Sequence, residues 1–389
     1  MRLVLIKRKK PLKYGGLIVV ALSLLTGIGV FALFSWSIGI NPYYVIESIL
    51  TTFIFPGIVK DFLILSLLGY ALLIAFKGSL WNIGAEGQMH MAIIASVYVT
   101  LILFFTTEKS LPIHVSIGVV LLSIVLATIA GALWGGLAGA IKAYTGVDEV
   151  PVTLILNYIA YFIGNILVYG PFRGKYVWGY VRTDLLPAPY KLSISVKKTI
   201  TGDPIVDTLN GYLVEAIIYS SWITALIIVA IFTYWLFNKS SLGLKIKILG
   251  SNPDYLVTLG VNVKKTTVTA FMLSGAIAGL TGALYYHGAL WRLEYPLEYQ
   301  TMGYGYLAIL VTWLSMLDMK FIPISAYIVS ALIMGSQRVS SLPVVREAFA
   351  VIGLGGAEIA FRLLMFGSVL LSYSILRFIQ DYEIRVVKS

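Results

Sequence analysis

Long apolar runs, each of a length suited to crossing a membrane, follow one another along this chain with short polar stretches between them. A transmembrane helix needs about 20 consecutive apolar residues. We therefore predict an all-α fold, a polytopic membrane bundle of about ten transmembrane helices. The expected spans are about 16–38, 61–77, 89–106, 113–141, 150–170, 216–238 and 266–289, two more within 303–337 that divide near Asp318, and 351–377.

The stretch 82–88 interrupts this pattern between the second and third runs. Glu86 lies there between Gly84 and Gly87, with Asn82 and Gln88 at the two ends. A charged side chain at the centre of a membrane helix costs about 2.5–3.5 kcal/mol, so it faces a cavity, a partner or the interface. Irregular backbone at membrane depth is tolerated where it faces protein or water. We predict a broken helix whose polar groups face something that passes or binds.

Composition supports the same class of protein. The chain has 389 residues, of which 59% are hydrophobic and 12% charged, and its mean hydropathy is +0.89. Soluble domains are about 45–50% apolar and about 25% charged. The absence of cysteine excludes disulfides and thiolate metal sites. The three histidines are scattered, so we expect no metal site.

The distribution of positive charge predicts the orientation of the chain. Six basic residues and no acid occupy the first 13 positions, directly before the first apolar run. Cytoplasmic segments of membrane proteins carry an excess of Lys and Arg. The net charge of +11 is thus read as a topological signal, and no nucleic-acid partner is expected. The predicted organisation is a cytoplasmic N-terminus at 1–15, a transmembrane domain at 16–377 with an external loop at 171–213 and a cytoplasmic loop at 239–265, and a cytoplasmic tail at 378–389.

The loop 239–265 contains the signals of a short helix over about 253–259. Asn252 is a good N-cap, Pro253 suits the first helical position, Asp254 complements the positive helix end, and Gly260 is a natural stop. The helix would carry apolar residues outside the bilayer, among them Tyr255, Leu256 and Leu259. Two interpretations are open: docking to another protein, or a position at the lipid headgroups that basic flanks would also suit.

Glycines recur every four residues in two of the predicted spans. Gly131, Gly135 and Gly139 form one series, and Gly275 and Gly279 form another. Small residues at this spacing let membrane helices approach closely. We interpret both series as helix packing and assign them no transport role.

Several chemical signatures are missing. There is no G-x-x-x-x-G-K-[ST] segment that would cradle nucleotide phosphates, and no G-x-S-x-G or H-E-x-x-H segment. We therefore expect no enzyme activity and no cofactor in this chain. The polar residues at depth are mostly amides, hydroxyls and tyrosines, whereas ion-coupled carriers usually show several carboxylates or an arginine series.

Three segments carry a resemblance to a known family. The first is Gly-Ser-Leu-Trp-Asn-Ile-Gly-Ala-Glu-Gly-Gln at 78–88, with Trp81 where the family usually has Phe. The second is the run 146–160, which contains Thr-Leu-Ile-Leu-Asn-Tyr-Ile-Ala. The third is Gly-Ser-Asn-Pro-Asp at 250–254, followed by 260–263 and 271–280. Together they resemble the membrane permease subunit of ATP-binding-cassette importers, in the simple-sugar and nucleoside branch.

The resemblance implies a multi-pass permease of the plasma membrane that carries a nucleoside first and a simple sugar second. It also implies an ATPase subunit that binds the loop 239–265 and holds ATP and Mg²⁺. The other implied partners are an extracellular solute-binding lipoprotein of the basic-membrane-protein type, a second permease chain (identical or homologous) and membrane lipid.

The same resemblance, together with the residue types, gives two candidate sites. Amide and carboxylate side chains could hydrogen-bond hydroxyls or bases of the solute, and aromatic side chains could stack on its ring. The alternative for each amide is a hydrogen bond between helices, worth about 0.6 kcal/mol. The candidate substrate path is Trp81, Asn82, Glu86, Gln88, Asn157, Tyr158 and Tyr161. The candidate ATPase-coupling residues are Asn252, Pro253, Asp254, Tyr255, Leu256, Leu259 and Gly260. Two other functions remain open: a stand-alone secondary carrier or channel for a small polar solute, and a structural or signalling membrane protein.

Overall fold

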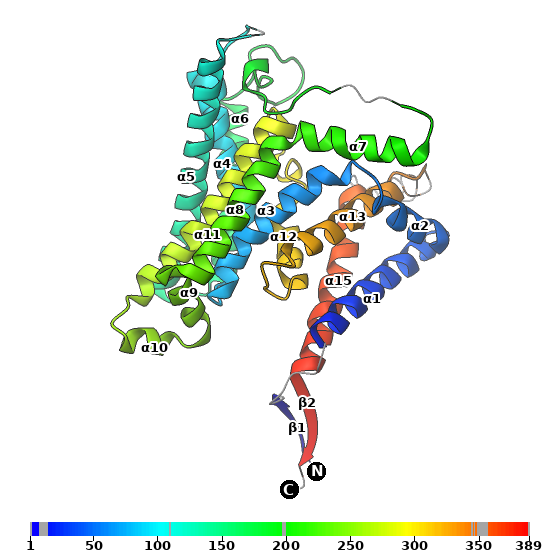
Figure 1. Cartoon of the computed structure of the whole chain (residues 1–389), viewed down its shortest axis with the longest axis vertical. Helices are drawn as coiled ribbons and strands as arrows, with labels where there is room; N and C mark the ends of the chain where they lie inside the picture. The colour runs from blue at the N-terminus through cyan, green and yellow to red at the C-terminus, as the bar shows by residue number, and fades with distance from the viewer. Residues whose placement is uncertain are drawn as a thin grey trace. The chain divides into compact units, whose positions relative to one another are not determined.

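Figure 1 shows the protein as a computed structural model, which describes residues 2–7, 15–108, 110–196, 200–343, 345, 347 and 357–387. Within these residues nine helical segments are long and apolar enough to cross a membrane. They are Gly15–Ser37, Ile58–Lys77, Ala85–Leu103, Ile113–Thr145, Glu149–Tyr169, Ser220–Lys239, Val263–Leu290, Ile322–Ser340 and Leu363–Asp381. The predicted all-α polytopic membrane fold is confirmed.

The region 303–337 differs from the prediction. Its first helix, α12, covers only Tyr304–Leu314, which is too short to cross a membrane alone. A turn with positive φ at Met316 and Leu317 follows, and α13 runs from Ile322 to Ser340. The last predicted span begins at 351, outside the described residues; the structure describes its continuation as α15, Ala357–Asp381.

The chain divides into two compact units. One comprises residues 1–58 and 328–389, with α1 (Gly15–Ser37), α2 (Pro42–Thr52), most of α13, and α15. In it the Ser368 hydroxyl of α15 donates to the Gly27 carbonyl of α1 over 3.0 Å. Two strands that the sequence analysis did not predict, β1 (Arg2–Lys7) and β2 (Tyr382–Val387), pair antiparallel, so the two ends of the chain lie side by side (Figure 1).

The second unit covers residues 59–327 and holds the candidate sites. Its long helices are α3 (Ile58–Lys77), α4 (Ala85–Val97), α5 (Ile113–Thr145), α6 (Glu149–Tyr169), α8 (Ser220–Lys239) and α11 (Val263–Tyr285). The π-helical turns η1 (Tyr98–Leu103) and η3 (Tyr286–Leu290) extend α4 and α11. Shorter elements are η2 (Ala188–Tyr190), α7 (Pro204–Ile218), α9 (Ser241–Ser251), α10 (Pro253–Thr258), η4 (Leu297–Tyr299) and α12.

Helices α5 and α11 pack through the two glycine series, as predicted. A Cβ atom added to Gly135 would lie 2.5 Å from the Phe271 carbonyl oxygen, and one added to Gly279 would lie 2.6 Å from the Ala127 carbonyl oxygen. Any larger side chain would push the two backbones apart. This contact holds α11 against α5. Gln88, near the start of α4, also lies close to Gly135 of α5.

Candidate functional site

The helical pattern breaks between α3 and α4. Helix α3 ends at Lys77, residues 78–84 form turns and irregular backbone, and α4 begins at Ala85. Ser79 has a φ of 53°, in the left-handed region, which reverses the chain direction after α3. The break therefore lies at 78–84, earlier than the predicted 82–88, and residues 85–88 are helical, with Glu86 in the first turn of α4. We call residues 78–84 the broken segment.

Glu86 is completely buried and ties α4 to residues 301–305, around the start of α12. Its Oε2 accepts a hydrogen bond of 2.6 Å from the backbone N–H of Gly305, and its Oε1 accepts one from the Thr301 hydroxyl. His90, one turn along α4, has Nδ1 4.0 Å from Oε1. A carboxylate at a helix N-terminus also faces the positive end of the helix dipole. Glu86 therefore stabilises the start of α4 and the end of 301–305 together.

Asn157 of α6 connects both sides of the break. Its Oδ1 accepts from the backbone N–H of Gly87 over 2.8 Å. Its Nδ2 donates to the Ile83 carbonyl over 3.0 Å and to the Tyr306 hydroxyl over 3.1 Å. Asn157 thus satisfies backbone groups that a continuous helix would have paired internally, which is the requirement for irregular backbone at membrane depth.

Asn82 and Gln88 form a reciprocal amide pair across the break. Asn82 Nδ2 donates to Gln88 Oε1 over 3.2 Å, and Gln88 Nε2 donates to Asn82 Oδ1 over 3.0 Å. Asn82 also donates to the Ser274 hydroxyl of α11 over 2.9 Å and accepts from the backbone N–H of Gly84 over 3.0 Å. Both amides are buried. The pair fixes the broken segment to α11.

Three of the predicted path residues are aromatic, and two of them are exposed. Trp81 is 38% exposed and stacks on Trp313 of α12, with ring centroids 5.3 Å apart and planes at 11°. Tyr158 of α6 is 54% exposed, whereas Tyr161 is buried with its ring edge-on to His90 at 4.7 Å. Trp81 and Tyr158 thus present rings outward, while the four polar candidates are buried and bonded within the chain.

Sequence reasoning missed several residues that complete this arrangement. Thr301 and Gly305 hold Glu86, Trp313 stacks on Trp81, and Glu149 accepts from the backbone N–H of Trp81 over 3.0 Å. The carboxylate of Glu149 also pairs with Lys142 at 2.7 Å. No local motif marks these residues, because each meets its partner across more than sixty positions of sequence, except for the pair formed by Lys142 and Glu149. The prediction that all seven candidates line a path stays a prediction.

The capped helix predicted in the loop 239–265 is present as α10, Pro253–Thr258, with Asp254 in its first turn. Asn252 Oδ1 accepts from the backbone N–H of Tyr255 over 3.1 Å, and Gly260 has a φ of 70°. Leu256 is fully buried within this chain, so it is not free to contact a partner. The exposed apolar residues are Tyr255, Val257 and Leu259, each more than half exposed. We call these three side chains the α10 face.

Helix α9, which was not predicted, lies in the same loop before α10 and contacts the broken segment. The Ser79 hydroxyl donates to the Gly250 carbonyl over 2.8 Å. A Cβ atom added to Gly250 would lie 2.5 Å from the Lys77 carbonyl oxygen, so only glycine allows this approach. A displacement of α9 and α10 would therefore act directly on the start of the broken segment.

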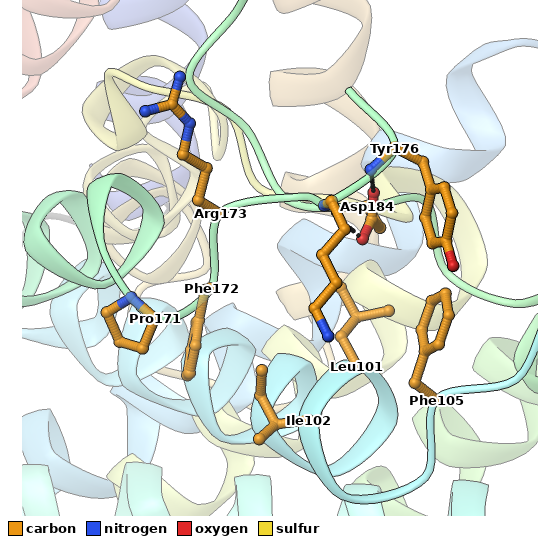
Figure 2. A pocket seen from close by; sticks show the side chains of 9 residues that line it. Leu101, Ile102, Phe105, Pro171, Phe172, Arg173, Tyr176 and Asp184 are labelled. Carbon is orange, nitrogen blue, oxygen red and sulfur yellow. Dashed lines mark hydrogen bonds between the residues drawn. The ribbon is translucent and has the colours of Figure 1, made fainter. Parts of the chain in front are cut away.

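A pocket of about 370 Å³ lies between the end of η1 and the loop that follows α6. Figure 2 shows Phe105 and Tyr176 together on one side and Pro171 and Phe172 on the other. The Phe105 and Tyr176 rings stack with centroids 6.1 Å apart. Asp184 Oδ1 accepts from the backbone N–H of Tyr176 over 3.0 Å and holds the loop in place. Arg173 and Lys175 also line the pocket, and neither forms an ion pair with a residue that the structure describes.

Residues 54–372 match the protein family described as the branched-chain amino acid transport system permease component. A nucleoside ABC transporter permease of Lactococcus lactis is 30% identical over 261 residues, which cover 67% of this chain and 61% of that protein. A guanosine ABC transporter permease of Bacillus subtilis is 29% identical, over 69% of this chain and 67% of that protein. A glucose ABC transporter permease of Haloferax volcanii is 28% identical, over 63% of this chain and 59% of that protein. The match therefore spans about three fifths of the first relative's length. No solved structure matches the chain significantly.

Proposed function

Because this chain belongs to the family of branched-chain amino acid transport system permease components, we propose that it is the permease subunit of an ATP-binding-cassette importer in the plasma membrane. A nucleoside is the first choice of solute and a simple sugar the second. The printed functions of the relatives, nucleoside, guanosine and glucose transport, support this order.

The observation that carries the proposal is the broken segment. Asn82, Gln88 and Asn157 hold it, and Glu86 fixes the start of α4 directly after it; each of these side chains is bonded to backbone or side-chain groups of this chain. Such a network keeps an irregular backbone rigid at membrane depth. The role we assign to the four polar residues is to position the break, and the role of Trp81 and Tyr158 is to meet the solute.

Aromatic surfaces suit both solute classes. A base or a sugar ring can stack on the face of an exposed indole or phenol, and Trp and Tyr supply large rigid contact area at a small entropic cost. Trp81 and Trp313 already stack on each other with nearly parallel planes. We propose that a solute ring adds to this stack, while hydroxyl groups of the solute bond to Tyr158.

The power for import would come from a partner. An ATPase subunit that binds ATP and Mg²⁺ would dock on the α10 face, and its movement would reach the broken segment through α9, Gly250 and Ser79. A solute-binding lipoprotein would dock on the opposite side, where the pocket of Figure 2 offers stacked rings and two cations that have no ion-pair partner among the described residues. A second permease chain would complete the path. Pairing of β1 with β2 supports a common location of both termini, which we propose to be cytoplasmic from the basic residues at the start of the chain.

Co-purification tests the ATPase partnership. We expect wild-type permease to retain its nucleotide-binding subunit, and the triple variant Tyr255→Ala, Val257→Ala, Leu259→Ala to lose it. Burial of three such side chains is worth about 2–4 kcal/mol, which weakens binding about 30-fold or more. Leu244→Ala, an exposed apolar residue on α9, is the matched control.

Two results would contradict the proposal. Retention of the ATPase by the triple variant would exclude docking on the α10 face and favour the position at the lipid headgroups. Uptake by the permease alone, without an ATPase or binding protein, would favour the stand-alone carrier instead.

A further inference from the structure

A groove of about 530 Å³ opens on the surface of the unit formed by residues 59–327, apart from the candidate path. Helices α5 and α8 form its walls, and Leu280 and Leu284 of α11 lie between them. The walls are mainly aliphatic, with Ile117 and Leu121 on α5 and Ile228 on α8. Figure 1 shows these three helices running beside one another.

The groove lies on the exposed sides of two candidate membrane spans. Its wall helices are two of the nine candidate spans, and only 28% of the apolar window of each is buried within the protein. Ile117, Leu121 and Ile228 are each half exposed or more. Side chains of this kind on a membrane span are covered by lipid tails or by another apolar surface.

One end of the groove carries a positive charge. Pro189, Lys191 and Leu192, from the loop between α6 and α7, line that end, where α5 and α8 begin. The Lys191 ammonium lies 4.4 Å from the centre of the Trp291 ring. Lys191 forms no ion pair with any residue that the structure describes. A lysine beside a tryptophan, at the end of a membrane helix, is the arrangement found at the level of lipid headgroups.

A hydroxyl in the wall also lacks a partner. Ser221 Oγ, near the start of α8, is buried and forms no hydrogen bond. A buried polar atom without a partner costs about 1–3 kcal/mol, so such atoms usually have one. Ser221, the second residue of α8, lines the same groove as Lys191.

We propose that this groove binds one anionic phospholipid. Its acyl chain lies along α11 between α5 and α8, its phosphate pairs with Lys191, and an ester carbonyl accepts from the Ser221 hydroxyl. The dimensions favour an acyl chain over a partner helix: a helix is about 10 Å across with a pitch of about 5.4 Å, so the groove would hold little more than one turn of it.

Native mass spectrometry of the full-length permease, released from nanodiscs of equal phosphatidylglycerol and phosphatidylcholine, tests this. We expect wild-type protein to retain phosphatidylglycerol preferentially. Lys191→Gln should lower that preference about fivefold, since one lysine near an anionic headgroup contributes that much. Lys175→Gln, which removes a cation from the same loop outside the groove, should leave the preference unchanged.

A second pair of variants tests the groove itself. Thr224→Trp places a large ring in its wall and should reduce retention of both lipids, whereas Ile227→Trp, exposed on α8 but outside the groove, should not. Equal preference in wild type and Lys191→Gln, or equal retention in both Trp variants, would overturn the proposal. So would a photo-crosslinker at Thr224 that captures a polypeptide in place of phosphatidylglycerol.

Discussion

Replacing Glu86 by leucine should destabilise the protein while leaving membrane insertion intact. The carboxylate is completely buried and accepts hydrogen bonds from the Gly305 N–H, at 2.6 Å, and from the Thr301 hydroxyl. Leucine is similar in size but accepts neither bond. Both donors would remain buried without their acceptor, because Gly305 packs directly on the backbone of Glu86.

The size of the effect follows from these two donors. Each buried donor left without an acceptor costs about 1–3 kcal/mol. Leucine also removes the cost of burying a carboxylate, which offsets part of the loss. We therefore expect a net destabilisation of about 2–4 kcal/mol, which lowers the melting temperature of a 389-residue chain by about 2–5 °C, at an unfolding entropy of about 2.1 cal/mol/K per residue.

Thermal unfolding in nanodiscs, with expression and membrane levels matched, measures this. The melting temperature of Glu86→Gln should lie between those of wild type and Glu86→Leu, because the glutamine oxygen still accepts a hydrogen bond from the Gly305 N–H and its NH₂ group can donate to the Thr301 hydroxyl. Glu298→Leu, at an exposed position in η4, should change little. The reasoning is refuted if Glu86→Leu melts at the wild-type temperature or if Glu86→Gln melts no higher than Glu86→Leu.

Three further predictions follow from the same contacts. A single cysteine introduced at Ser193 should react with an impermeant reagent added outside the cell, and labelling only from the cytoplasmic side would reverse the proposed topology. Gly135→Leu should overpack the contact between α5 and α11, destabilise the protein by about 1–3 kcal/mol or more and so lower its melting temperature. The control is Gly118→Leu, whose position on the same helix has nothing within 4 Å. Equal melting temperatures of the two variants would refute the packing argument. In the assembled transporter, Gly250→Ala should uncouple ATP hydrolysis from solute uptake, whereas the control Ser251→Ala should not. Normal coupling in Gly250→Ala would show that α9 does not transmit the movement of the ATPase.

Local signals in the sequence were sufficient to predict helix α10. An N-cap, a proline at the first position and a glycine stop all act within one turn, and the helix was predicted to within one residue of its end. The broken segment was also predictable in kind, because glycines and an acid cannot continue a lipid-facing helix. Its start at residue 78 was not, since it depends on the left-handed Ser79 and on the approach of Gly250.

Distant partners account for the remaining differences. Helix α12 is shorter than its apolar run suggested because it ends at Leu314, before the positive φ of Met316 and Leu317. Residues 301–303 before it stay non-helical. Thr301 there meets Glu86, a contact that spans 215 positions of sequence. The strands β1 and β2 pair the two ends of the chain, and hydropathy carries no information about such pairing. Burial of Leu256 likewise depends on tertiary packing that the loop sequence does not reveal.

The most direct test of the central claim is solute accumulation in proteoliposomes. The permease would be reconstituted with its ATPase subunit, with ATP and Mg²⁺ on the ATPase side and the binding protein with a panel of labelled nucleosides on the other. Our account predicts that a nucleoside accumulates above its external concentration only when the ATPase, ATP and the binding protein are all present. Accumulation by the permease without ATP, or equilibration that stops at the external concentration in the complete system, would contradict it.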